Sequence, residues 1–192
     1  RRVLGQVDPG LFGRGGIQGL YIVEPNLQVT AQRLDARPAV LRRWILAHEL
    51  IHVAQFTSAP WLIDRQEATL RAVLRAAVDG RVDEAALRRL QQMMTVIEGY
   101  AEWQMDALLD ADVSTLRTAV DQRRRAPDPL TRLVGAVVGL DRKLTQYVTG
   151  RAFFLRVADS PVRPTRVFDG PSALPTGAEL SAPDRWVARM DR

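Results

Sequence analysis

The chain has 192 residues, of which 46% are hydrophobic, so it is long enough to bury a core in one domain. It contains no cysteine, which excludes disulfide bonds and thiolate metal sites and leaves histidine and carboxylate as metal ligands. The net charge of +5 comes from arginines scattered among acidic residues, and no apolar run approaches the ~20 residues of a transmembrane helix. These properties predict a cytoplasmic protein that binds neither nucleic acid nor membranes.

The N-terminal part of the chain predicts irregular structure and one strand. Residues 1–18 hold several glycines and are predicted to be irregular. Residues 19–23 form a β-rich run, predicted as a strand of a small sheet, and residues 27–34 are compatible with a short helix. Asp35 is a typical helix N-cap residue, and Pro38 fits the first turn of the helix that follows it.

Most of the remaining chain shows the 3.6-residue apolar periodicity that predicts helices. The proline-rich segment 160–192 is predicted to be mostly extended coil wrapped on the body, with a short helix over Pro183–Met190. The predicted fold class is therefore mainly α (α+β), with a small β element. The other predicted helices cover about residues 36–57, 61–79, 83–110, 113–124 and 130–158.

The stretch from His48 to His52 reads H-E-x-x-H and holds the only two histidines of the chain. On a helix these two side chains lie one turn apart on the same face, where both imidazoles can bind one Zn²⁺. Glu49 would then act as general base on a metal-bound water. The alternative is a helix with two ordinary histidines and a salt-bridging glutamate. The surrounding residues are apolar, so burial of these polar groups without a metal would be costly.

Two histidines leave a catalytic zinc ion one protein ligand short, and the missing ligand must be a carboxylate. Glu98, Glu102 and Asp106 recur every four residues and share one face of a predicted helix that is otherwise apolar. We favour Glu98 as the ligand, because Gly99 beside it would let the other helix approach closely. Glu102 would accept the free N–H of a ligating histidine, although the two glutamates are interchangeable in these roles. Asp106 is either an outer contact of the site or a surface residue, and a solvated acidic stripe is the alternative for all three.

The order of H-E-x-x-H on one helix and Glu-Gly-x-Ala-Glu on a later helix resembles the gluzincin group of zinc metallopeptidases. The chain resembles more closely a zincin-like family of hydrolases associated with coenzyme F420 biosynthesis, whose function is not established. The resemblance covers nearly all of the chain and implies a single zincin-like domain over residues 1–192, the C-terminal part of a longer protein. The matching stretches are residues 3–9, 23–26, 48–56, 60–62, 98–106, 139–147, 174–176 and 186–189.

By that resemblance His48, His52 and Glu98 would bind Zn²⁺ and Glu49 would be the base. We therefore expect a zinc-dependent hydrolase with a zincin-like metalloprotease core, acting as a metallopeptidase on a peptide or protein substrate. Tyr147 and Tyr100 are candidate hydrogen-bond donors to the oxyanion, with packing as the alternative. The strand near residues 20–23 is a candidate edge for pairing with an extended peptide.

Three other functions stay open at this stage. The first is a zinc-binding domain without protease activity that serves as a partner-binding module, and the intact Glu49 argues against it because Glu49 is not a ligand. The second is an amide hydrolase that acts on a small metabolite. The third is a basic nucleic-acid binder that uses Arg123–Arg125, which lacks interleaved aromatic residues. The sequence determines neither the substrate, nor the physiological metal, nor the oligomeric state.

Overall fold

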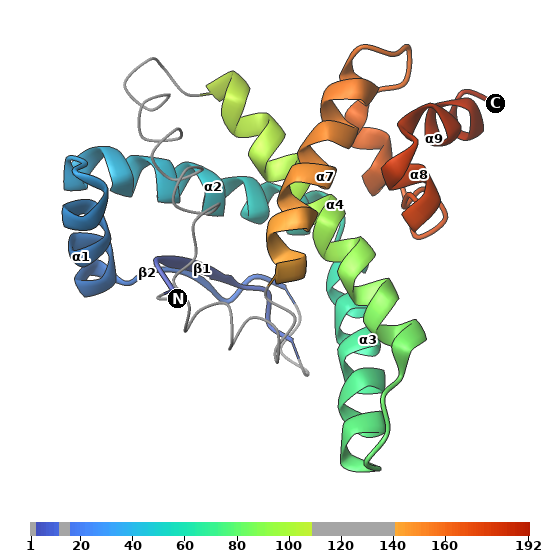
Figure 1. Cartoon of the computed structure of the whole chain (residues 1–192), viewed down its shortest axis with the longest axis horizontal. Coiled ribbons are helices and arrows are strands. Elements are labelled where there is room, and N and C mark those ends of the chain that lie inside the picture. The colour runs from blue at the N-terminus through green and yellow to red at the C-terminus, as the bar shows by residue number, and fades with distance from the viewer. Residues whose placement is uncertain (1–2, 12–15, 109–140) are drawn as a thin grey trace.

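The computed structural model describes residues 3–11, 16–108 and 141–192, and for residues 108 and 141–148 it describes the backbone alone. Within these ranges the chain is mainly helical, with one two-stranded sheet near the N-terminus (Figure 1). The predicted mainly α fold with a small β element is therefore confirmed. The helix predicted over residues 113–124 and Arg123–Arg125 lie outside the described residues.

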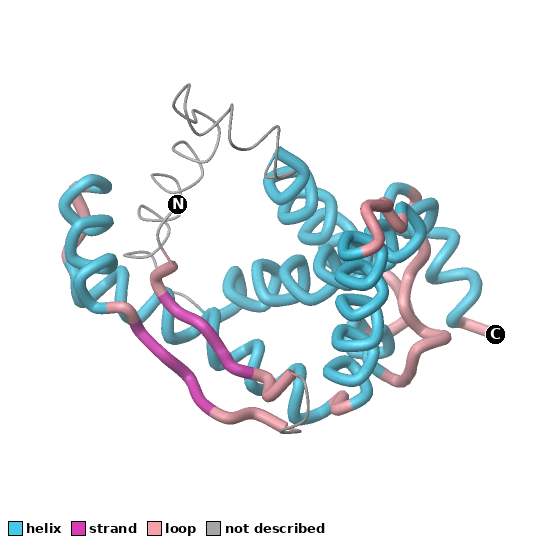
Figure 2. Tube along the Cα trace, turned by 90° about the horizontal axis from the view of Figure 1, so that it is seen from below, coloured by secondary structure: helices cyan, strands magenta, loops and turns pink. Residues whose placement is uncertain are grey.

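The sheet consists of β1 (Gly5–Asp8) and β2 (Gly19–Ile22), which pair in antiparallel fashion. The strands lie side by side along one margin of the molecule (Figure 2). The prediction of irregular structure was wrong for residues 5–8. Only Val7 in this strand is buried, so no apolar alternation marks it, and its conformation depends on pairing with the later strand.

The two helices that follow are α1 (Glu24–Leu34) and α2 (Pro38–Ser58). Helix α2 confirms the predicted helix, but the prediction of Asp35 as its N-cap was wrong. Asp35 instead ends α1 in the left-handed conformation, with φ of 50°, which aspartate tolerates better than most residues. The N-cap of α2 is Arg37, whose extended backbone is the conformation favoured before proline.

Helices α3 (Trp61–Val78) and α4 (Glu84–Leu108) confirm two predicted helices over the described residues. They form an antiparallel hairpin whose tip extends away from the other elements (Figure 1). Gly80 makes the turn with φ of 67°. The base of the hairpin packs with β1 and α2 through buried apolar residues, which are Val7, Phe56, Ala59, Leu62, Ile63, Met93 and Ile97. This packing fixes α4 beside α2.

Helix α7 (Asp141–Ala158) packs against α4, and the two helices touch at Gly99 and Gly150. A methyl group on Gly99 would collide with the backbone of Gly150. We expected Gly99 to admit the histidine-bearing helix, but the helix that approaches it is α7. The main core joins α1, α2, α4, α7 and the C-terminal segment, and its buried side chains include Leu27, Leu41, Trp44, Val96, Phe153, Phe154 and Trp186.

The C-terminal segment contains the 3₁₀-helix η1 (Pro164–Phe168) and the helices α8 (Gly177–Ser181) and α9 (Pro183–Met190). The helix predicted over residues 183–190 is confirmed, but the prediction of mostly extended coil was wrong. Prolines occupy the first turns of η1 and α9, where no backbone N–H is needed. Trp186 anchors the segment: its side chain is fully buried, and its indole N–H donates to the Ala173 carbonyl at 2.7 Å.

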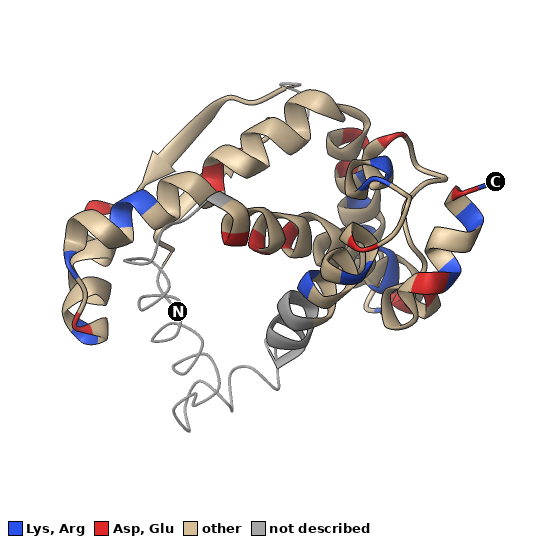
Figure 3. Cartoon of the chain, turned by 90° about the horizontal axis from the view of Figure 1, so that it is seen from above, with Lys and Arg blue, Asp and Glu red and all other residues tan. Residues whose placement is uncertain are grey.

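Positively and negatively charged residues are distributed along the ribbon of the described helices, not gathered in one element (Figure 3). Over the same part of the chain, no helix combines the length and the apolar character that a membrane crossing requires.

Candidate metal centre

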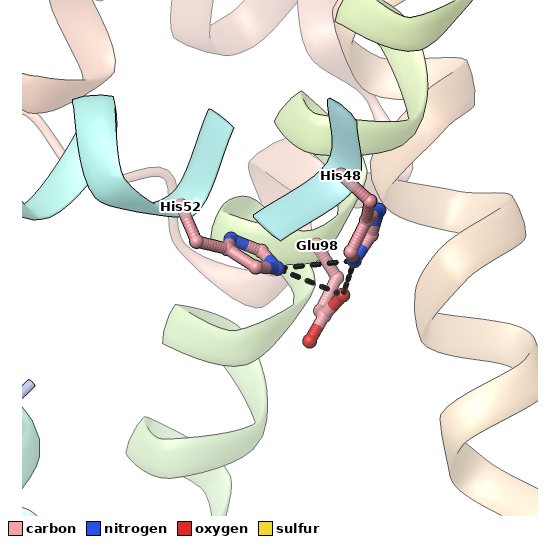
Figure 4. A group of neighbouring side chains, drawn as sticks. All are labelled: His48, His52 and Glu98. Carbon is pink, nitrogen blue, oxygen red and sulfur yellow. Dashed lines mark hydrogen bonds and ion pairs between the residues drawn. The ribbon is translucent and has the colours of Figure 1, made fainter. Parts of the chain in front are cut away.

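His48 and His52 lie one turn apart on α2, and their Nε2 atoms are 3.1 Å apart. Helix α4 packs against α2 and places Oε2 of Glu98 3.3 Å from Nε2 of His48 and 3.6 Å from Nε2 of His52 (Figure 4). Three potential ligand atoms from two helices therefore form a small triangle. Among the described residues, this is the group of histidines and carboxylates close enough to share one ion.

The dimensions of this triangle fit a zinc ion. Ligand atoms about 2.0–2.1 Å from a tetrahedral zinc are separated by about 3.3 Å, and the three separations of 3.1, 3.3 and 3.6 Å bracket that value. Oε2 of Glu98 is buried and makes no hydrogen bond of acceptable geometry, although both imidazoles lie within ion-pair distance. A cation between the three atoms would satisfy this oxygen. The donor set, two imidazoles and one carboxylate, is one that catalytic zinc uses.

The electrostatics of the three groups also favour a cation. Burial alone would raise the pKa of Glu98, but the two adjacent imidazoles hold it well below its usual range, so the carboxylate stays ionised. Burial alone would lower the pKa of His52, yet the Glu98 carboxylate raises it above its usual value. The buried carboxylate thus attracts positive charge to His52, as a proton or as a metal ion.

Glu49 lies between α2 and β1, and its side chain is buried. Burial raises the pKa of Glu49, and the attraction of His52 and His48 offsets part of this effect. The backbone N–H of Val7 donates a hydrogen bond to the carboxylate. A Cβ atom at Gly5 would lie 2.9 Å from both Cγ and Oε1 of Glu49, so only glycine lets β1 approach this closely. Neither contact of β1 with Glu49 could be predicted from local sequence features.

The comparisons with known proteins agree with this geometry. The model of the zincin-like metallopeptidase family matches residues 1–81 and 76–187. The chain belongs to this family. This zincin-like chain is also similar to a crystal structure from Chloroflexus aurantiacus, described as a candidate hydrolase with a novel fold, with 35% identity and a TM-score of 0.73. The similarity covers 100% of the chain but 64% of that protein. No curated protein is significantly similar.

Family membership and the three converging side chains support a hydrolase with a metal-binding site. The residues predicted to surround the zincin-like site are placed differently from our expectation. We expected Glu102 to accept the N–H of a ligating histidine. The group beside Nδ1 of His52 is instead Oε1 of Gln55, at 2.7 Å, while Nδ1 of His48 is buried without a hydrogen-bond partner. Glu102 itself is buried on α4, one turn beyond Glu98.

Asp106 pairs with Arg151 of α7, whose Nε donates to Oδ2 at 2.7 Å, so the structure favours the surface alternative for this residue. Tyr100 is buried, its ring contacts neighbouring aromatic rings, and its hydroxyl accepts a hydrogen bond from Gln104. These contacts favour a packing role for Tyr100. Tyr147 lies on α7 among the residues whose side chains are not described.

Sequence reasoning missed Gln55, although the sequence contained a usable signal. A residue three positions after His52 lies on the same face of the helix, and a glutamine there interrupts an otherwise apolar surface. Its side chain amide also donates to the carbonyl of Ile97 on α4 at 2.9 Å, and only the folded structure reveals this contact.

Proposed function

We propose that the protein is a zinc metallopeptidase, in which His48, His52 and Glu98 bind Zn²⁺ and Glu49 acts as general base. The observation that carries the proposal is the triangle of donor atoms with separations of 3.1, 3.3 and 3.6 Å. Glu49 lies close enough to His52, His48 and Glu98 to interact electrostatically with all three, without being one of the three donors.

A bound zinc ion would supply an acidified water molecule and a Lewis acid for the substrate carbonyl. The contribution of the chain itself is proton transfer by the Glu49 carboxylate. This group takes the proton of the attacking water and delivers it to the nitrogen of the departing amine. Burial raises the pKa of Glu49 toward the operating pH, which suits a group that must both accept and release a proton. The N–H of Val7 orients the carboxylate.

The position of β1 supports an extended peptide as substrate. The N–H of Val23 donates to the carbonyl of Leu4 at 2.9 Å, so Leu4 and Val23 form a hydrogen-bonded pair. Because such pairs alternate along an antiparallel ladder, the backbone groups of Gly5 and Val7 point away from β2. The N–H of Val7 reaches Glu49 on that side. We expected the strand over residues 20–23 to offer the edge, but β1 is the strand beside Glu49.

The decisive experiment compares the zinc-loaded wild type with Glu49→Gln on casein and on a fluorogenic peptide library. The variant should keep one zinc ion per chain and lose about 10²–10⁴-fold in kcat, because it lacks the base but no ligand. Glu84→Gln is the control, since Glu84 is an exposed residue of α4 that pairs with Arg88. Full activity in Glu49→Gln would remove the base from the proposal. Hydrolysis of small amides without any cleavage of peptides would overturn the substrate class.

A further inference from the structure

We propose that Gln55 is a positioning residue that fixes the tautomer of His52 and couples this ligand to the helix carrying Glu98. The inference rests on the proposed zinc site and extends it by a residue outside the H-E-x-x-H motif. Gln55 is 2% exposed, and both ends of its amide are engaged, one within α2 and one with α4.

The orientation of the amide follows from its partner on α4. The carbonyl oxygen of Ile97 can only accept a hydrogen bond, so the group 2.9 Å away must be the NH₂ of Gln55. The amide oxygen then faces Nδ1 of His52 at 2.7 Å. This oxygen is also only an acceptor, so Nδ1 must carry the hydrogen. The two bonds together leave no freedom to flip the amide.

A hydrogen on Nδ1 leaves the lone pair of the neutral imidazole on Nε2. Nε2 is the atom that lies 3.1 Å from Nε2 of His48 and 3.6 Å from Oε2 of Glu98. Gln55 therefore selects the tautomer that directs a lone pair toward the other two donor atoms. A hydrogen on Nε2 would block this position, so the selection matters for metal binding.

The same amide links the two helices that supply the ligands. Ile97 directly precedes Glu98, so the bond from Gln55 holds the turn of α4 that carries the carboxylate. His52 is thereby held at a set distance from the backbone next to Glu98. Loss of the amide would disturb the orientation of His52 and the distance between His52 and Glu98. Misplaced ligands of this kind weaken metal sites.

No side chain of the described residues holds Nδ1 of His48 in the way that Gln55 holds Nδ1 of His52, so the positioning role of Gln55 is specific to His52. The imidazole of His48 stacks on the indole of Trp44, with ring centroids 6.3 Å apart and an interplanar angle of 24°. Its Nδ1 atom is buried and has no hydrogen-bond partner. Packing thus orients His48, whereas hydrogen bonds orient His52.

The test measures zinc affinity, not hydrolysis, by competition with a chromophoric chelator on folded protein. Gln55→Leu should bind zinc about 10–100-fold more weakly than the wild type, the usual cost of removing a group that orients a ligating histidine. Gln55→Glu keeps an acceptor for Nδ1 and should recover part of the affinity. The control is Gln66→Leu, a partly buried glutamine of α3 whose amide nitrogen lies 3.8 Å from Sδ of Met94. It should stay within about twofold of the wild type, since it touches no ligand.

A second readout does not use Gln55→Leu and covers the case in which that variant does not fold. Histidine labelled with ¹⁵N gives signals from only two side chains here, because the chain has only two histidines. In the zinc-loaded protein, one Nδ1–H signal should show a strong hydrogen bond, and this signal should change in Gln55→Glu but not in Gln66→Leu. Zinc binding by Gln55→Leu at wild-type affinity, or no hydrogen-bonded Nδ1–H in the wild type, would overturn the role of Gln55 alone. A wild type that binds no zinc would overturn the proposed function and this inference together.

Discussion

Two regions of the molecule bury a glutamate in different ways, and the difference separates structure from function. In the C-terminal segment, Glu179 receives hydrogen bonds from Nε of Arg189 at 2.6 Å and from the backbone N–H of Thr176 at 2.7 Å. Where α2 meets α4, Glu98 faces two imidazoles and keeps a buried oxygen without a hydrogen bond. Both oxygens of Glu179 accept hydrogen bonds from neighbouring groups. The buried Oε2 of Glu98 lacks a hydrogen bond, and a bound cation would supply the missing partner.

The two glutamates also differ in what they contribute to the fold. Thr176 and Glu179 form a capping box at the start of α8, so the charge of Glu179 helps to fold the segment around it. Glu98 has no such local role, and in the described structure the groups that offset the cost of its burial are the two imidazoles, not an arginine or a lysine. We interpret a buried carboxylate that faces two imidazoles and keeps one oxygen without a hydrogen bond as the signature of the ligand site.

The largest expected effect is the loss of the metal when Glu98 is removed. Glu98→Ala should lose most of its zinc and its hydrolytic activity, a larger effect than the roughly 10–100-fold cost of losing a residue that only orients a ligand. Glu179→Ala should keep one zinc ion per chain, because its partners lie in the C-terminal segment. Elemental analysis after dialysis measures both. Normal zinc content in Glu98→Ala would transfer the ligand role to Glu102.

The next effect is on the free energy of unfolding. An ion that binds only the folded state stabilises it by about 4 kcal/mol at a thousand times its Kd. Zinc should therefore raise the stability of the wild type and of Glu179→Gln by the same amount, and should leave Glu98→Ala unchanged. Chemical denaturation with and without zinc gives these differences. A zinc effect that disappears in Glu179→Gln would mean that the two regions are not independent.

A smaller effect is expected at the crossing of α4 and α7. Gly150→Ala places a methyl group against the Thr95 carbonyl and the backbone of Gly99, and overpacking of this kind costs about 1–3 kcal/mol. Zinc affinity should fall as well, since Gly99 directly follows Glu98. Gly170→Ala is the matched control in the C-terminal segment, because its added methyl would meet no atom within 4 Å. Equal stability of the two variants would contradict the close contact between the helices.

The smallest effect concerns Glu179 and depends on pH. Burial alone would raise the pKa of Glu179, but Arg189 and Thr176 lower it below its usual value. A carboxyl group with a lowered pKa stabilises the fold above its unfolded pKa of about 4.3, and this stabilisation disappears as the pH falls through the folded value. Glu179→Gln should thus cost about 1–2 kcal/mol at neutral pH and progressively less in acid. Thermal denaturation at several pH values measures this, and a cost that grows in acid would be the wrong sign.

Much of the helical framework was predictable because the responsible signal is local. The apolar periodicity around His48 and His52 placed both on one face of α2, and the spacing of Glu98 placed it on α4. The chemical need for a third ligand pointed to a carboxylate of this helix, but it did not distinguish Glu98 from Glu102. The reason for favouring Glu98, a close approach at Gly99, applies to α7 instead. The capping box of α8 was also readable, since Thr176 and Glu179 have its spacing, but the prolines around it led us to predict coil.

The remaining features depend on contacts between distant parts of the chain. Nothing near β1 in the sequence marks it as a strand, because its partner lies beyond a glycine-rich segment. The contact of Gly99 with Gly150 and the bond from Gln55 to Ile97 each join different helices. Local propensity does not encode such contacts, so sequence reasoning assigned Gly99 the wrong neighbour and assigned Glu102 the place that Gln55 occupies.

Zinc binding by His48, His52 and Glu98 is tested most directly by anomalous diffraction at the zinc absorption edge, using crystals of the zinc-loaded protein. We expect one peak about 2.0–2.2 Å from Nε2 of His48, Nε2 of His52 and a carboxylate oxygen of Glu98, with one coordination position left for water. A peak bound elsewhere, or no peak at this site in fully loaded protein, would contradict it.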